Sequence, residues 1–120
     1  MEEEKIALKV VCEKFKKNNT NIRGVFKTKT YLTVQEKISF IQNYYKTLED
    51  IFKNGNYKYA EQLVSFTFFN LMVVKAYTNI DFEITFESMD LLQQDGLIGK
   101  IVEKIGEDYI TLSEFIKPNL

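Results

Sequence analysis

Carboxylate side chains are the residues of this chain with the most scope for chemistry. The sequence contains no histidine, and this removes the commonest general base near neutral pH and the commonest metal ligand. Two clusters of acidic residues remain. One comprises Asp81, Glu83 and Glu87, and the other is the adjacent pair Glu107 and Asp108. Carboxylates alone can bind a hard cation or act as an acid–base pair. The spacing matches no calcium-binding loop, so we interpret these residues as solvated faces opposite apolar ones.

Other chemical signatures are missing from the sequence. Cys12 is the one cysteine, so the chain can form neither an intramolecular disulfide nor a thiolate metal cluster. A single cysteine fits a reducing compartment. On an apolar helical face it is better explained as a small core residue than as a nucleophile. Neither GxGxxG nor a Walker-type loop occurs. We therefore expect a protein that is not an enzyme and uses no cofactor or metal.

Charge is balanced overall but unevenly distributed. The net charge is −1, yet residues 1–75 hold 13 Lys and Arg against 8 Asp and Glu, and residues 76–120 hold 3 against 9. Such a chain can pair head to tail with copies of itself, or its two halves can neutralise each other within one fold. The sharpest basic group is a candidate interaction site: Lys14, Lys16, Lys17, Arg23, Lys27 and Lys29.

Aromatic residues make up 14% of the chain, with five tyrosines near residues 44–77. Aromatics beside lysines can stack on single-stranded nucleic acid, and they are equally typical of cores and protein interfaces. The near-zero net charge favours core and interface over nucleic acid. Residues 63–77 are densely apolar but too short for a membrane span, which needs about 20 residues. The start of the sequence lacks the pattern of a signal peptide.

The first part of the chain predicts a helix, a turn and an extended arm. Apolar residues at helical spacing, from Leu8 to Phe15, indicate a helix over 3–17, although the alternation around Val10 also allows a strand. Residues 18–24 form a turn. Residues 25–32 alternate like a strand that pairs within the chain or with a neighbour.

The second helix carries the clearest signature. Thr33 followed by Glu36 is a capping-box pattern, and Asn54-Gly55 is a typical helix end. Between them runs an apolar seam at 4-3-4-3-4 spacing, formed by Val34, Ile38, Ile41, Tyr45, Leu48 and Phe52. We expect this seam to pack against the next helix, antiparallel to it because the connection is short.

That next helix, expected over 57–78, is apolar on nearly every face, and this is typical of a central helix. Residues 80–86 then alternate like a strand or an extended loop. Short helices are predicted from Met89 to Gln94 and from Leu97 to Ile105, the latter ended by Gly106. Thr111 with Glu114, a second capping-box pattern, predicts a last helical turn. The sequence thus predicts a single, mainly α domain over 1–120. We expect a compact helical bundle around the central helix 57–78, with extended segments near 25–32 and 80–86. Residues 1–24 are a candidate N-terminal helical extension.

The order of packing positions resembles small proteins of tailed bacteriophages, those of the virion locus that serve in head–tail joining, the neck or tail assembly. Three segments carry the resemblance: KTYLTVQEKISFIQ at 29–42, NGNYKYAEQLVSFTFFNLMVVKAYTNIDFE at 54–83, and DLLQQDGLIGKIVEKIGEDY at 90–109. The resemblance covers about residues 25–115 and brings no functional residue with it. It implies a virion structural or assembly protein located in the host cytoplasm or the virion.

Three functions follow as hypotheses. The first is a non-enzymatic phage protein that acts through protein–protein contacts with phage proteins or with its own copies. The second is a small phage inhibitor of a host defence or regulatory protein, with a host protein as partner. The third is an enzyme that uses the carboxylates of Asp81, Glu83 and Glu87. The absence of catalytic motifs favours the first.

Overall fold

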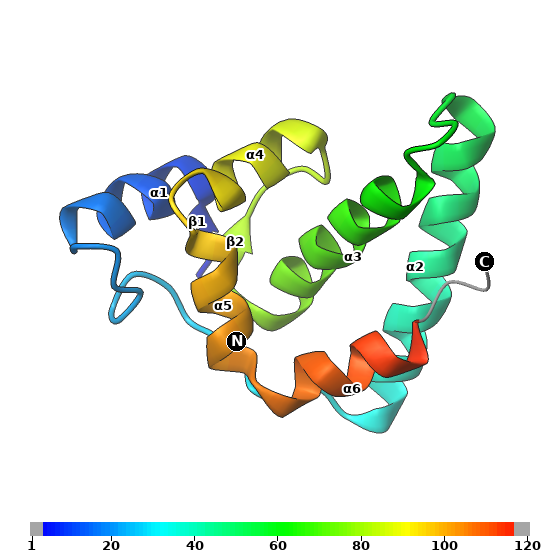
Figure 1. Ribbon diagram of the computed structural model, residues 1–120. Coiled ribbons are helices and arrows are strands. Elements are labelled where there is room, and N and C mark those ends of the chain that lie inside the picture. Colours follow the sequence, from blue (N-terminus) through cyan, green and yellow to red (C-terminus); the bar gives the residue numbers. More distant parts are fainter. Residues whose placement is uncertain (1–3, 117–120) are drawn as a thin grey trace.

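The computed structural model describes residues 4–116, and this part of the chain is mainly helical, as predicted (Figure 1). Its elements in chain order are β1 (Ile6–Ala7), α1 (Leu8–Lys17), α2 (Val34–Asn54), α3 (Glu61–Tyr77), β2 (Ile80–Asp81), α4 (Phe86–Gln94), α5 (Leu97–Ile105) and α6 (Glu107–Phe115).

Helix α3 is the centre of the fold. It contacts α2, α4, α5 and β2, and its residues Leu71, Val73 and Val74 are completely buried. The expected central helix is therefore present, but its cover is incomplete toward its N-terminal end. Leu63 is 65% exposed, and Phe66 is 49% exposed.

The start of α2 is as predicted. The Thr33 hydroxyl accepts a hydrogen bond from the Glu36 N–H, and the Glu36 carboxylate accepts one from the Thr33 N–H, so both signatures of the capping box are present. The helix ends at Gly55, also as predicted. The start of α3 differs from the prediction, because Tyr57–Ala60 forms a turn in which Tyr59 has φ 69°, so the helix begins at Glu61.

The predicted seam of α2 is buried only in part. The buried residues of this helix are Phe40, Tyr44 and Leu48, so the stripe that meets the core is rotated from the predicted one. Leu48 belongs to both stripes, and Ile41 and Phe52 are half-buried. The remaining seam residues stay exposed: Val34, Ile38 and Tyr45. The prediction that the whole seam packs on α3 is therefore wrong for its N-terminal half.

The N-terminal segment and the extended arm meet at the end of α3. Strand β1 pairs in parallel with β2, and Thr28 of the arm forms an antiparallel bridge with Thr78. Asn79 joins these segments, because its side-chain oxygen accepts from the Lys27 N–H and its side-chain nitrogen donates to the Glu4 carbonyl, both at 2.8 Å. The arm thus pairs within the chain. The helix predicted over 3–17 is present only from Leu8, where α1 begins, and it packs on α4. The prediction was wrong at Ile6–Ala7, which form β1, and residue 3 lies outside the described residues.

The C-terminal half departs from the predictions in three places. Strand β2 is only two residues long, and α4 begins at Phe86, so that residue belongs to a helix and is 40% exposed. Helix α5 has the predicted bounds. Gly106, with φ 71°, ends α5 and at once begins α6, so Thr111 lies inside α6 and caps no helix. A cap pattern is a local signal, and here the turn at Gly106 starts the helix earlier.

The uneven burial of α3 predicts unequal costs for one substitution at two positions. We expect Leu71→Ala to lower the free energy of unfolding by about 2–5 kcal/mol, because Leu71 is fully buried and truncation leaves a cavity. Leu63→Ala, in the same helix, should change it by less than about 0.5 kcal/mol. Urea unfolding followed by circular dichroism measures both. Similar costs at the two positions would contradict this burial pattern.

Candidate functional site

The most elaborate polar contact in the described part of the chain surrounds Asp108. One of its carboxylate oxygens accepts hydrogen bonds from the Tyr77 hydroxyl at 2.6 Å and the Leu32 N–H at 2.8 Å. The other lies 3.0 Å from the Lys37 ammonium, which also lies 4.2 Å from the centre of the Tyr31 ring. The residue is only 8% exposed. Helices α2, α3 and α6 and the arm therefore meet at one carboxylate.

The protonation of this cluster follows from its contacts. Burial alone raises the pKa of Asp108, but the hydrogen bonds from Tyr77, Leu32 and Lys37 outweigh burial and hold that pKa below its usual value. Burial and the adjacent carboxylate both raise the pKa of Tyr77 far above its usual range. Asp108 is thus ionised and occupied by protein donors, which suits a structural anchor. Its interpretation as part of a solvated acidic face was wrong.

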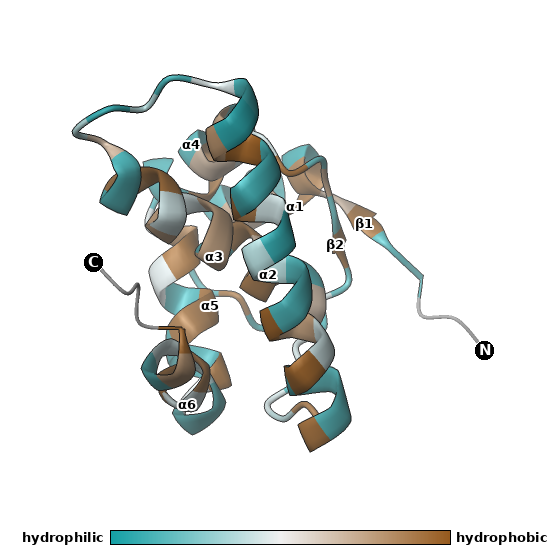
Figure 2. Cartoon of the chain, turned by 90° about the vertical axis from the view of Figure 1, so that its right-hand side faces the viewer, coloured by the Kyte–Doolittle hydropathy of each residue, from teal (hydrophilic) through white to brown (hydrophobic). Residues whose placement is uncertain are grey.

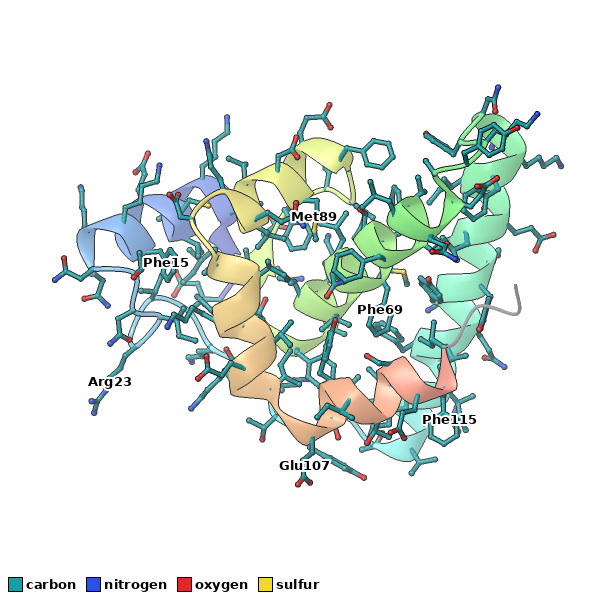
Figure 3. The ribbon with its side chains drawn as sticks, in the orientation of Figure 1. Phe15, Arg23, Phe69, Met89, Glu107 and Phe115 are labelled. Carbon is teal, nitrogen blue, oxygen red and sulfur yellow. The ribbon has the colours of Figure 1, made fainter. Side chains whose placement is uncertain are left out.

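The other predicted acidic candidates lie on the surface. Asp81, Glu83, Glu87 and Glu107 are all exposed, and Glu107 projects away from the body of the molecule (Figure 3). Within residues 4–116, no group of three or more His, Cys, Asp or Glu side chains is placed to hold a metal ion.

Cys12 lies on the side of α1 that packs against α4. Its side chain is half-buried, and the sulfur lies 3.7 Å from the Leu91 carbonyl oxygen. Burial, and to a lesser extent the charge of Asp95, raises the pKa of the thiol. A thiol of raised pKa is a weak nucleophile, so this environment suits a packing residue.

The six basic candidates are divided by the fold. Lys14, Lys17 and Arg23 line one shallow hollow, and Lys14 also lines the next one together with Lys27. Arg23 projects outward from its loop (Figure 3). The other two lie elsewhere. Lys16 pairs with Asp95 at 3.5 Å, and Lys29 is an exposed residue of the arm.

An apolar concavity lies between α2 and α3, and we call it the α2–α3 groove. It has a volume of about 560 Å³. Its apolar lining comes from both helices and from the segments that flank them: Leu32, Phe40, Met72, Ala76 and Ile84. Its α2 wall carries uncharged polar residues one helical turn apart: Gln35, Ser39, Asn43 and Thr47. Glu36 and Lys75 complete the lining. A concave, mostly apolar site with a few polar groups is the usual form of a binding site.

A second hollow of about 480 Å³ lies between α2, α3 and α6 and is lined by aromatic rings. Phe69 points from α3 toward this region, and its ring packs on those of Tyr44 and Tyr109 (Figure 3). Both hydroxyls already have partners, because Tyr44 donates to the Ser65 carbonyl and Tyr109 to the Asn70 side chain. Burial raises the pKa of Tyr44 to about 12. Because the hydroxyls of its two tyrosines are paired within the protein, this hollow suits packing better than recognition.

Sequence reasoning missed the groove, although part of the signal was present. The polar residues Gln35 to Thr47 recur every fourth position, and this spacing indicates one side of a helix. Leu32 and Ile84 are distant in sequence, however, and only the fold brings them to the same concavity.

Comparison with known proteins yields no family assignment. No family model matches the chain, and no curated protein and no solved structure matches it either. Among residues 4–116, no helix has both the length and the apolar character needed to cross a membrane.

The Asp108 cluster makes stability depend on acid pH. The folded-state pKa of Asp108 lies below its unfolded value of about 4. The stability that ionised Asp108 contributes is therefore complete above about pH 4 and is lost as the pH falls through the folded-state pKa. We expect Asp108→Asn to lower the free energy of unfolding at pH 7 by about 2–3 kcal/mol, since it removes hydrogen bonds to a charged group. The difference from the unchanged protein should shrink toward pH 2. Urea unfolding across this range measures it.

Glu107→Gln is the matched control, because Glu107 is adjacent in sequence and exposed. It should change the free energy of unfolding by less than about 0.5 kcal/mol. Equal costs for the two variants, or a cost of Asp108→Asn that is constant with pH, would be inconsistent with a buried, ionised anchor.

Proposed function

We propose that this protein acts without catalysis, by binding an apolar or amphipathic segment of a protein partner in the α2–α3 groove. The observation that carries the proposal is the groove itself, a concavity of about 560 Å³. It has an apolar floor beside a wall of uncharged polar residues. Grooves of this kind receive the apolar face of a helix, which inserts residues spaced three and four apart.

The lining defines what such a partner should contain. One buried side chain of the size of leucine or phenylalanine would contribute about 1.5–3 kcal/mol through apolar burial on Phe40, Met72 and Ile84. Ser39 and Asn43 are exposed, so their hydrogen-bonding groups are available to the flank of the partner. That flank is expected to be mainly polar, with a charge favoured only where it can pair with Glu36 or Lys75 of the lining, because an unpaired charge would lose hydration against this wall.

The proposed setting is the assembly of a tailed bacteriophage, where the protein would join virion components. The resemblance at residues 29–42, 54–83 and 90–109 supports this setting. The alternative is a phage inhibitor that binds a host defence or regulatory protein through the same groove. The two differ in the source of the partner.

Filling the groove tests the proposal. We expect Ser39→Trp to reduce capture of the partner at least about tenfold, because the indole occupies space that the inserted segment needs. Affinity capture from infected and uninfected host cells, followed by mass spectrometry, identifies the partner. Recovery of phage structural proteins from infected cells alone supports the assembly function, whereas a host protein recovered from both supports the inhibitor.

Two controls separate filling of the groove from other effects. Ser39→Ala leaves the groove open and should capture normally. Gln93→Trp adds the same bulk at an exposed position of α4 and should also capture normally. Unchanged capture by Ser39→Trp would reject the groove as the binding site, and failure to capture any protein from either kind of cell would reject the function.

A further inference from the structure

We infer that two copies of this protein pair through the N-terminal halves of their α2 helices, antiparallel and about a two-fold axis. The contact surface is the α2 stripe, defined as Val34, Ile38, Ile41 and Tyr45. It is distinct from the α2–α3 groove, and the inference does not rest on the function proposed above.

The α2 stripe is an apolar surface that the fold leaves open. Val34 is 66% exposed, Ile38 43% and Tyr45 44%, while Ile41 is half-buried. In Figure 2, where α2 faces the viewer, apolar residues mark its lower, N-terminal part. The core takes a neighbouring side of the helix, Phe40, Tyr44 and Leu48, so of the stripe only Ile41 is partly covered. Open apolar surfaces of this kind mark contact sites.

The spacing of the stripe indicates that its occupant is a helix. Its residues follow one another at intervals of four, three and four, which is the heptad spacing of helices that pair side by side. The stripe spans 34–45, about three helical turns, and over that length this spacing keeps its residues facing a second helix.

The residues along the stripe favour a second copy of the same helix. The stripe is tapered, with the small Val34 at one end and the large Tyr45 at the other. An antiparallel pair places Val34 against Tyr45 of the second copy and Ile38 against Ile41 of the second copy, so that the smallest residue meets the largest and the two isoleucines meet each other.

The charges beside the stripe are compatible with this pairing. Gln35 and Gln42 flank it on one side and are neutral. On the other side Lys37 is engaged by Asp108, at 3.0 Å. Two identical surfaces can therefore meet without like charges facing each other. A two-fold contact uses the same patch on both copies and closes at a dimer.

Sedimentation equilibrium tests the dimer. The unchanged protein should approach twice its 14.1 kDa chain mass at high concentration. Ile38→Glu should raise the dimer dissociation constant at least about 100-fold, because the two-fold axis introduces the charge twice. Leu63→Glu is the matched control, since Leu63 is also exposed and apolar but lies on α3, and it should leave the dissociation constant unchanged. A strict monomer, or equal effects of the two variants, would overturn the inference.

Disulfide trapping tests the orientation. In a Cys12→Ala background, Val34→Cys combined with Tyr45→Cys should form a covalent dimer on mild oxidation. The two new cysteines lie 11 residues apart on one helix, about 16 Å, so they cannot bridge within a chain. Each single variant should stay uncrosslinked, because the two copies of either residue lie at opposite ends of the contact. Crosslinking of the single variants, or none in the pair, would reject the antiparallel contact.

These results are independent of the groove test. A dimer that captures no protein would support this contact and reject the proposed function. A monomer that captures a partner through the groove would do the reverse.

Discussion

The carboxylate of Asp108 is the constraint around which the arm and three helices are arranged. A buried charge is tolerated only where donors replace the water it has lost, and here the donors come from Leu32, Lys37 and Tyr77. Each donor belongs to a different part of the fold: the end of the arm, the first turns of α2 and the end of α3. The position of α2 relative to α6 therefore depends on electrostatics as well as on apolar packing.

This arrangement explains why α2 offers two surfaces. The helix is fixed at its N-terminal end by the Asp108 cluster and along one side by Phe40, Tyr44 and Leu48. Because one packed neighbour covers only one side of a helix, both flanks of α2 stay open. One flank forms the polar wall of the α2–α3 groove, and the other carries the α2 stripe. The same helix could thus serve two contacts at once without competition between them.

Local signals predicted the parts of the fold that are locally determined. The capping box at Thr33 and the bounds of α5 could be read from the sequence, since cap residues and glycines act on neighbouring backbone groups. The buried side of α2 could not, because this helix carries two overlapping apolar stripes and the approach of α3 selects between them. The role of Asp108 was equally inaccessible, since its partners Leu32 and Tyr77 are distant in sequence. The groove was missed for the same reason.

The way in which Asn79 joins the ends of the chain has a kinetic consequence. Its side chain bonds to Glu4, 75 residues away, while Asp108 reaches back 76 residues to Leu32. Helical proteins usually fold quickly because most of their contacts are local, and contacts of long range slow the search. During synthesis the N-terminal strand and α1 must wait until β2 and α4 have emerged before they can dock. We therefore expect closure of its longest loops to limit the folding of this small helical protein, with the apolar face of α1 exposed until that step is complete.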